Sequence, residues 1–183
     1  MRRGVFLDRD GVLNEPVVRD GKPYPPSDAN ELVMCPGADV AARELRDAGF
    51  ALIVVSNQPD IARRTTSAQT VDAINAKLRS LVPLDDVLVC AHDDADACRC
   101  RKPRPGLLEE GARRHGIDLA RSYMVGDRWR DIEAGAAAGC RTALIDRGYA
   151  ERGPATPPHA RVGSLLEAAR WIIEDQRTQH AGN

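Results

Sequence analysis

The chain has 183 residues, with 26 Lys or Arg and 27 Asp or Glu, and its formal net charge at pH 7 is -1. This balance excludes the strongly basic surface that sequence-independent binding to nucleic acid or to anionic membranes requires. The length suits one domain, residues 1–183, with a full hydrophobic core. Because no apolar run approaches a membrane span and the first apolar run is too short for a signal peptide, we expect a cytoplasmic protein.

The first apolar run, residues 5–7, predicts a buried strand that ends in Asp8-Arg9-Asp10-Gly11. Two carboxylates this close repel each other, and a divalent cation with oxygen ligands removes that cost. Gly11 permits a sharp turn directly after them. The alternative is an ordinary solvated turn, because Asp and Gly are common turn residues.

Helical and extended patterns alternate along the rest of the chain. Residues 15–36 are rich in Pro and are predicted to form a loop or flap. Strands are predicted at 51–55, 87–89, 123–125 and 142–145, and helices at 38–48, between Ser67 and Pro83, between Pro105 and Gly116, at 131–138 and at 164–175. Residues 150–162 are expected to be irregular and the tail from about 176 to 183 frayed. This alternation predicts an α/β fold with a doubly wound parallel sheet.

Polar residues follow several of the predicted strands. Ser56 and Asn57 come after strand 51–55, and Cys90 comes after strand 87–89. Asp127 comes after strand 123–125. In doubly wound sheets ligands bind beyond the carboxyl ends of the strands, so these residues are predicted to gather around one site.

Four soft or borderline metal ligands lie in the loop 90–100; they are Cys90, His92, Cys98 and Cys100. They make a full tetrahedral set with no open position, so the sequence predicts a structural zinc ion. The alternative is a loop with free thiols and a surface histidine. Between the ligands, Asp93, Asp94 and Asp96 are interpreted as solvated carboxylates, although one of them could meet a cationic substrate. Fixing the last ligand would also fix the direction of the next two residues, Arg101 and Lys102.

Four stretches in this order resemble the motifs of the haloacid dehalogenase (HAD) superfamily of phosphohydrolases. They are residues 8–14, Ser56 with Asn57, Lys102, and residues 126–131. The resemblance implies a sheet with strand order 5-4-1-2-3, no separate cap domain, and Mg²⁺-dependent hydrolysis of a phosphomonoester. It assigns Asp8 as the nucleophile that forms an aspartyl-phosphate, and Asp10 as the general acid and then base.

The same resemblance assigns the remaining parts of the site. Ser56 would hydrogen-bond the phosphoryl oxygens, and Lys102 would offset their charge. Asp8, the backbone carbonyl of Asp10, and Asp127 would bind Mg²⁺. Asp131 would act on the metal indirectly, and its alternative is a helix N-terminal acid, a favoured position for a carboxylate. A solvated turn and a surface lysine are the corresponding alternatives for Ser56 and Lys102.

The zinc-loop pattern with the Cys-Arg-Lys-Pro run after it resembles one HAD branch, which contains heptose bisphosphate and histidinol-phosphate phosphatases. For a heptose bisphosphate, the cations Arg63, Arg101 and Arg128 would hold the second phosphate, and Asn57 would also contact substrate. For histidinol phosphate, the acidic zinc loop would face the amine. The loop 59–64 departs from the branch's usual sequence, and Arg63 has the alternative of a solvated surface arginine.

We favour the heptose substrate on this resemblance. A zinc-stabilised binding module without turnover is a third interpretation. The expected partner is a small phosphorylated metabolite, a sugar bisphosphate above all, and the expected assembly is a monomer or small homo-oligomer.

Overall fold

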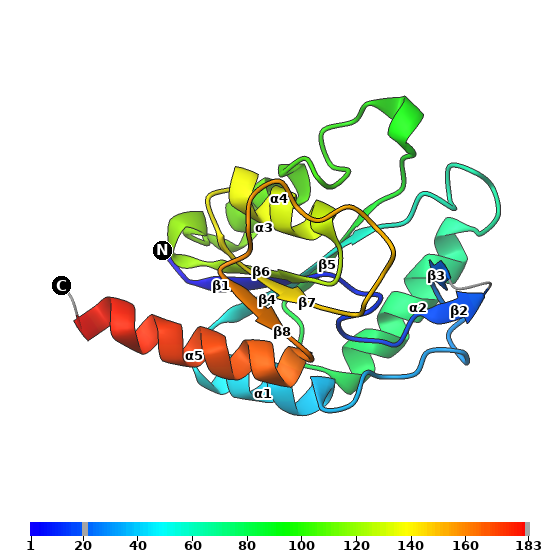
Figure 1. Ribbon diagram of the computed structural model, residues 1–183. Coiled ribbons are helices and arrows are strands. Elements are labelled where there is room, and N and C mark those ends of the chain that lie inside the picture. Colours follow the sequence, from blue (N-terminus) through cyan, green and yellow to red (C-terminus); the bar gives the residue numbers. More distant parts are fainter. Residues whose placement is uncertain (20–21, 182–183) are drawn as a thin grey trace.

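A computed structural model describes residues 1–19 and 22–181 (Figure 1). Six parallel strands form one sheet in the order β5-β4-β1-β6-β7-β8. Their bounds are β1 (Gly4–Leu7), β4 (Ala51–Asn57), β5 (Asp86–Cys90), β6 (Tyr123–Gly126), β7 (Arg141–Ile145) and β8 (Ala160–Val162). The first five of these in chain order correspond to the predicted strands, and their spatial order is the predicted 5-4-1-2-3.

Helices cover both faces of this sheet (Figure 1). On one face lie α1 (Ala38–Asp47), α2 (Ala68–Leu81) and α5 (Leu165–Ala181), and on the other lie α3 (Gly106–His115) and α4 (Trp129–Ala137). The side chains of β1 alternate between them, since Val5 and Leu7 join the first core and Phe6 joins the second. The strands are therefore apolar on both faces, as in the continuous apolar runs of the sequence.

Two predictions about irregular segments were wrong in part. The segment 15–36 contains an antiparallel hairpin, β2 (Val17–Arg19) and β3 (Lys22–Tyr24), rather than loop alone. The segment 150–162 contains the edge strand β8, which pairs with β7. Each of these strands has only three residues, which is shorter than the run of about four to eight residues by which an alternating strand is recognised in a sequence.

The predicted start of α2 agrees with the structure, and the predicted end of α5 does not. Ser67 caps α2, because its side chain accepts a hydrogen bond from the Thr70 backbone N–H. The last helix, α5, continues to Ala181, past its predicted end near residue 175. Asp175 anchors this extension because Tyr123 OH donates to one carboxylate oxygen and Arg141 to the other. The prediction of a frayed tail from about 176 was therefore wrong for residues 176–181, and residues 182–183 lie outside the described part.

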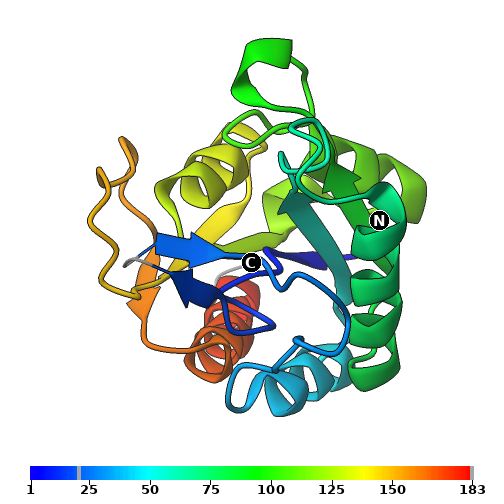
Figure 2. The same cartoon turned by 90° about the vertical axis from the view of Figure 1, so that its right-hand side faces the viewer.

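The carboxyl ends of the strands share one edge of the sheet. Figure 2 brings this side forward and shows the β2–β3 hairpin (blue) in front of it, with the loop after β5 (green) above. That loop includes the short 3-10 helix η1 (Asp94–Asp96), and a second one, η2 (Leu119–Arg121), precedes β6. In the part of the chain that the structure describes, no helix has the length and apolar character needed to cross a membrane. The one-domain organisation of residues 1–183 stays a prediction.

Candidate active site

A cavity of about 360 Å³ opens at the carboxyl edge of the sheet. The predicted site residues that line it are Asp8, Asp10, Asn57, Arg63, Arg101, Lys102, Asp127, Arg128 and Asp131. The hairpin contributes Tyr24 with the prolines on either side of it. Ser56 lies just beneath, buried at the end of β4, where its Oγ accepts a hydrogen bond of 2.9 Å from the lining residue Gln58. The fold thus gathers the residues of all four motifs.

Lys102 lies at the base of this cavity and is 2% exposed. Its Nζ is 2.7 Å from Asp8 Oδ1, 2.6 Å from Asp131 Oδ1, and 2.8 Å from the backbone oxygen of Val55. Burial by itself would lower the pKa of Lys102, but the charges of Asp131 and Asp8 outweigh it and hold the pKa above its ordinary value. Lys102 is therefore a fixed cation directed at Asp8.

Three carboxylates, those of Asp8, Asp127 and Asp131, offer oxygens within 4.8 Å of one another. Burial, together with the neighbouring carboxylates, raises the pKa of Asp8 to about 6 despite the opposing charge of Lys102. Burial and the charges of Asp8 and Asp131 likewise raise the pKa of Asp127 well above its ordinary value. The group therefore holds more negative charge than Lys102 alone balances.

The two carboxylate oxygens of Asp127 have different surroundings. Its Oδ2 accepts a hydrogen bond of 2.9 Å from Tyr149 OH, whereas its buried Oδ1 has no hydrogen-bond partner. A buried carboxylate oxygen needs a partner, and a metal ion could be that partner. The oxygens of the three carboxylates are hard ligands, so the site fits Mg²⁺.

Gly11 and Gly126 let the backbone approach these carboxylates closely. Gly11 has φ +85°, and a Cβ there would lie 1.9 Å from Asp127 Oδ2. A Cβ on Gly126 would lie 2.1 Å from the Cβ of Asp131. Only glycine fits both positions, because any side chain would displace a carboxylate of the site.

Asp131 serves the helix and the site at once. Its Oδ2 accepts a hydrogen bond of 3.0 Å from the Arg128 backbone N–H at the start of α4, and its Oδ1 meets Lys102. Both the predicted indirect role and the alternative helix N-terminal role are thus compatible with its contacts.

Asp10 is fixed by three side chains. Gln58 Nε2 and Asn14 Nδ2 each donate to it at 2.9 Å, and Arg9 Nη2 donates at 3.0 Å. Arg9 is fully buried, and its Nη1 donates to Asn75 Oδ1 of α2. This network presents the Asp10 carboxylate to the cavity in one orientation.

Asn57 contacts the backbone of Lys102 through both ends of its side-chain amide. Its Oδ1 accepts from the Lys102 backbone N–H and its Nδ2 donates to the Lys102 backbone oxygen, both at 3.1 Å. The amide therefore holds the backbone of Lys102, and because Asn57 also lines the cavity, its contact with substrate stays a prediction.

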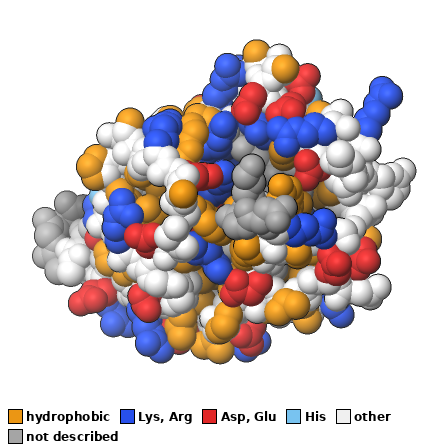
Figure 3. Space-filling model, turned by 45° about the vertical axis from the view of Figure 1, so that its right-hand side comes forward, with side chains coloured by type: hydrophobic (Ala, Val, Ile, Leu, Met, Phe, Trp, Pro, Cys, Tyr) orange, Lys and Arg blue, Asp and Glu red, His pale blue; other side chains and the backbone are white. Residues whose placement is uncertain are grey.

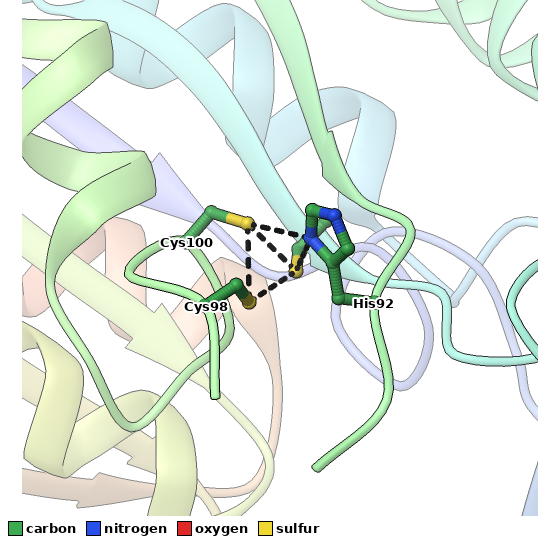
Figure 4. A group of neighbouring side chains, drawn as sticks. His92, Cys98 and Cys100 are labelled. Carbon is green, nitrogen blue, oxygen red and sulfur yellow. Dashed lines mark hydrogen bonds between the residues drawn. The ribbon is translucent and has the colours of Figure 1, made fainter. Parts of the chain in front are cut away.

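The four predicted zinc ligands converge, as Figure 4 shows for His92, Cys98 and Cys100. The Sγ of Cys90 is 3.6 Å from that of Cys98 and 2.9 Å from that of Cys100, and Cys98 and Cys100 are 3.5 Å apart. The Nδ1 of His92 is 3.3 Å from Cys100 Sγ. A tetrahedron with Zn–S bonds of about 2.3 Å has edges of roughly 3.8 Å, so this cluster has the composition and nearly the size of a zinc site.

The arginines of the cavity rim are paired with carboxylates. Arg63 donates to Asp93 at 2.6 and 2.9 Å, and Arg101 donates to Asp94 at 2.8 Å. Arg128 pairs with Glu151 in the same way. Figure 3 shows the resulting mixture of basic and acidic side chains around the loop at the top of the molecule. Asp93 and Asp94, interpreted from the sequence as solvated carboxylates, thus also form ion pairs with arginines of the cavity.

Comparisons with known proteins agree with this geometry. Residues 99–168 match a family model described as HAD-hydrolase-like. A D-glycero-β-D-manno-heptose-1,7-bisphosphate 7-phosphatase of Neisseria meningitidis is 31% identical over 97% of this chain and 98% of its own length. The phosphatase of the same name from Bordetella bronchiseptica is 36% identical to this chain, over 93% of this chain and 92% of its own length.

The chain belongs to the HAD phosphatases. It is thus an enzyme rather than the binding module considered above. The crystal structure of the D,D-heptose 1,7-bisphosphate phosphatase of B. bronchiseptica, complexed with magnesium and phosphate, superposes on this phosphatase with a TM-score of 0.81 at 32% identity. The match covers 94% of this chain and 99% of the other.

Among the described residues around this site, five that contact it had no assigned role in the sequence: Arg9, Asn14, Gln58, Arg130 and Tyr149. Arg9 lies within the first motif, but no sequence pattern connects it with Asn75, its buried partner on α2. Gln58 directly follows the Ser-Asn motif. Tyr149 lies in an irregular segment after β7, and nothing near it in the sequence points to Asp127.

Proposed function

We propose that this phosphatase removes the 7-phosphate of D-glycero-D-manno-heptose 1,7-bisphosphate through an aspartyl-phosphate on Asp8. The contact of 2.7 Å between Lys102 Nζ and Asp8 Oδ1, within a group of buried carboxylates, carries the proposal. A cation held beside a nucleophile also offsets the charge of the phosphoryl group that the nucleophile attacks. The names of the similar phosphatases from N. meningitidis and B. bronchiseptica support the choice of substrate.

Mg²⁺ would be held by Asp8, Asp127 and the backbone carbonyl of Asp10, with Asp131 acting indirectly through Lys102. The unpartnered Oδ1 of Asp127 supports this ligand set. When bound, Mg²⁺ neutralises the carboxylates and orients the phosphate oxygens.

In the first step a carboxylate oxygen of Asp8 bonds to phosphorus while the bond from phosphorus to the sugar oxygen breaks. Asp10 gives its proton to the departing oxygen. In the second step Asp10 takes a proton from water, the water oxygen bonds to phosphorus, and the bond to Asp8 breaks to release orthophosphate. The fixed donors Gln58 and Asn14 keep Asp10 in place for both transfers.

Ser56 and Lys102 would hold the phosphoryl group during these steps. The Oγ of Ser56 accepts from Gln58, which leaves its hydroxyl hydrogen for a phosphoryl oxygen. For Asn57 we now propose a positioning role, because its amide holds Lys102. Arg63, Arg101 and Arg128 would supply positive charge for the second phosphate.

A structural zinc ion is the second proposed cofactor. The ligand Cys100 lies two residues before Lys102 in the chain, so the ion would restrict the segment that carries this cation. Coordination by three cysteine thiolates is consistent with the reducing setting of the cytoplasm, where we propose that the enzyme acts.

The histidinol-phosphate alternative is not favoured, because the similar phosphatases from N. meningitidis and B. bronchiseptica are named for heptose 1,7-bisphosphate. Release of orthophosphate from heptose 1,7-bisphosphate and from histidinol phosphate, measured with Mg²⁺ present, decides between the two. We expect the bisphosphate to be at least tenfold better in kcat/KM, and Asp8→Asn to abolish both activities. A preference for histidinol phosphate would overturn the proposed substrate.

A further inference from the structure

One carboxylate at the cavity rim is held by two guanidinium groups. Arg101 Nε donates to Asp94 Oδ1 at 2.8 Å, and Arg130 Nη1 donates to the same oxygen at 3.1 Å. All three residues line the cavity that contains Asp8 and Lys102. The two guanidinium groups thus meet at one carboxylate oxygen on the lining of the cavity.

Both arginines are held in place independently of Asp94. The Arg101 side chain is 11% exposed, and its Nη1 also donates to the backbone oxygen of His92, a predicted zinc ligand. The Arg130 guanidinium stacks on the ring of Trp129, 4.7 Å from its centroid. Asp94 differs from them, because its side chain is 59% exposed and lies on the short helix η1 between the pairs of zinc ligands. The carboxylate is therefore the member of this cluster that can move.

We propose that Arg101 and Arg130 form a subsite for the remote anionic group of the substrate, and that the carboxylate of Asp94 occupies this subsite until the substrate displaces it. The inference rests on the proposed function and adds to it the residue Arg130 and the competing acid. Two guanidinium groups suit a phosphate, whose oxygens accept several charge-assisted hydrogen bonds at once.

Competition between Asp94 and the substrate for the subsite should weaken the binding of a bisphosphate. If Asp94 fills the subsite most of the time, the apparent dissociation constant of a bisphosphate is raised by the inverse of the open fraction. Removing the charge of Asp94 should therefore tighten the binding of a bisphosphate. A monophosphate that reaches only Asp8 and Lys102 gains little from the same change.

The test compares heptose 1,7-bisphosphate with heptose 7-phosphate by calorimetry in Mg²⁺, in full-length protein carrying Asp8→Asn so that neither ligand is consumed. The readout is the ratio of the two dissociation constants. We expect Arg130→Gln to reduce the preference for the bisphosphate about tenfold, and Asp94→Asn to increase it about threefold or more. Asp96→Asn and Arg99→Gln are matched controls. Asp96 is on the same turn and bonds the Asp93 N–H, and Arg99 is 92% exposed with its nearest ion pair to Glu109.

Each outcome decides the proposal. Opposite shifts of the ratio in the two variants, with unchanged ratios in the controls, support the subsite. Equal weakening of both ligands in Arg130→Gln and Asp94→Asn would show that the contacts only brace the loop, and would overturn it. Absence of any preference for the bisphosphate would overturn it as well. Failure of the proposed function appears separately, as absence of orthophosphate release from the bisphosphate by the unsubstituted enzyme.

Discussion

Replacing the nucleophile should make the metal-free protein more stable while it abolishes turnover. The pKa of Asp8 is raised from 3.8 to about 6, first by burial and then by the neighbouring carboxylates. The folded state therefore binds more protons than the unfolded state between these values, so the stability contributed by this site falls as pH rises from about 4 to 6. Each unit of pKa shift corresponds to about 1.4 kcal/mol, so the ionised carboxylate costs roughly 3 kcal/mol above pH 6.

Asp8→Asn removes this ionisation and keeps an oxygen that can accept a hydrogen bond from Lys102. Lys102 also keeps its ion pair with Asp131 and its hydrogen bond to the Val55 carbonyl. We expect the variant, stripped of Mg²⁺, to exceed the parent by up to about 3 kcal/mol in urea unfolding at pH 7.5, and by almost nothing at pH 4. Added Mg²⁺ should stabilise the parent more than the variant, because the ion binds the ionised carboxylate. A gain of equal size at both pH values, or a loss at pH 7.5, would refute the electrostatic reasoning, and retained turnover would remove Asp8 as nucleophile.

Three further substitutions, two with controls, probe the two proposed metal sites and the backbone beside Asp127. Tyr149→Phe should weaken Mg²⁺ binding several-fold in calorimetry, because Asp127 Oδ2 loses the partner that orients its free Oδ1. Tyr24→Phe is the control, since Tyr24 lines the cavity of Asp127 and should not change Mg²⁺ binding. Cys98→Ser should lose zinc in metal analysis and lower the unfolding temperature, and a parent protein without zinc would reject the site. Gly11→Ala should lower the free energy of unfolding by more than Gly49→Ala, which should lower it by about 1 kcal/mol. Both glycines have positive φ, but only at Gly11 does the new Cβ meet a carboxylate. Equal losses in the two variants would contradict the clash.

Much of the catalytic geometry follows from local features of the sequence. Apolar runs placed Asp8, Ser56, Cys90 and Asp127 at strand ends, and parallel pairing carries all strand ends to one edge. The convergence of Cys90, His92, Cys98 and Cys100, the proposed zinc ligands, was also predictable, because the four side chains lie within one short loop. In both cases the decisive interaction is either local in the chain or dictated by the regular geometry of the sheet.

Other features were decided only when distant segments met. Tyr149 reaches Asp127, Asn75 fixes Arg9, and Arg130 shares Asp94 with Arg101, yet no periodicity or motif connects these partners. The sequence determined which chemistry the strand ends carry, because backbone pattern and side-chain type are local properties. Which charges are paired, which carboxylate oxygen stays without a partner, and which acid fills the arginine pair depend on side-chain directions that only the packed structure fixes.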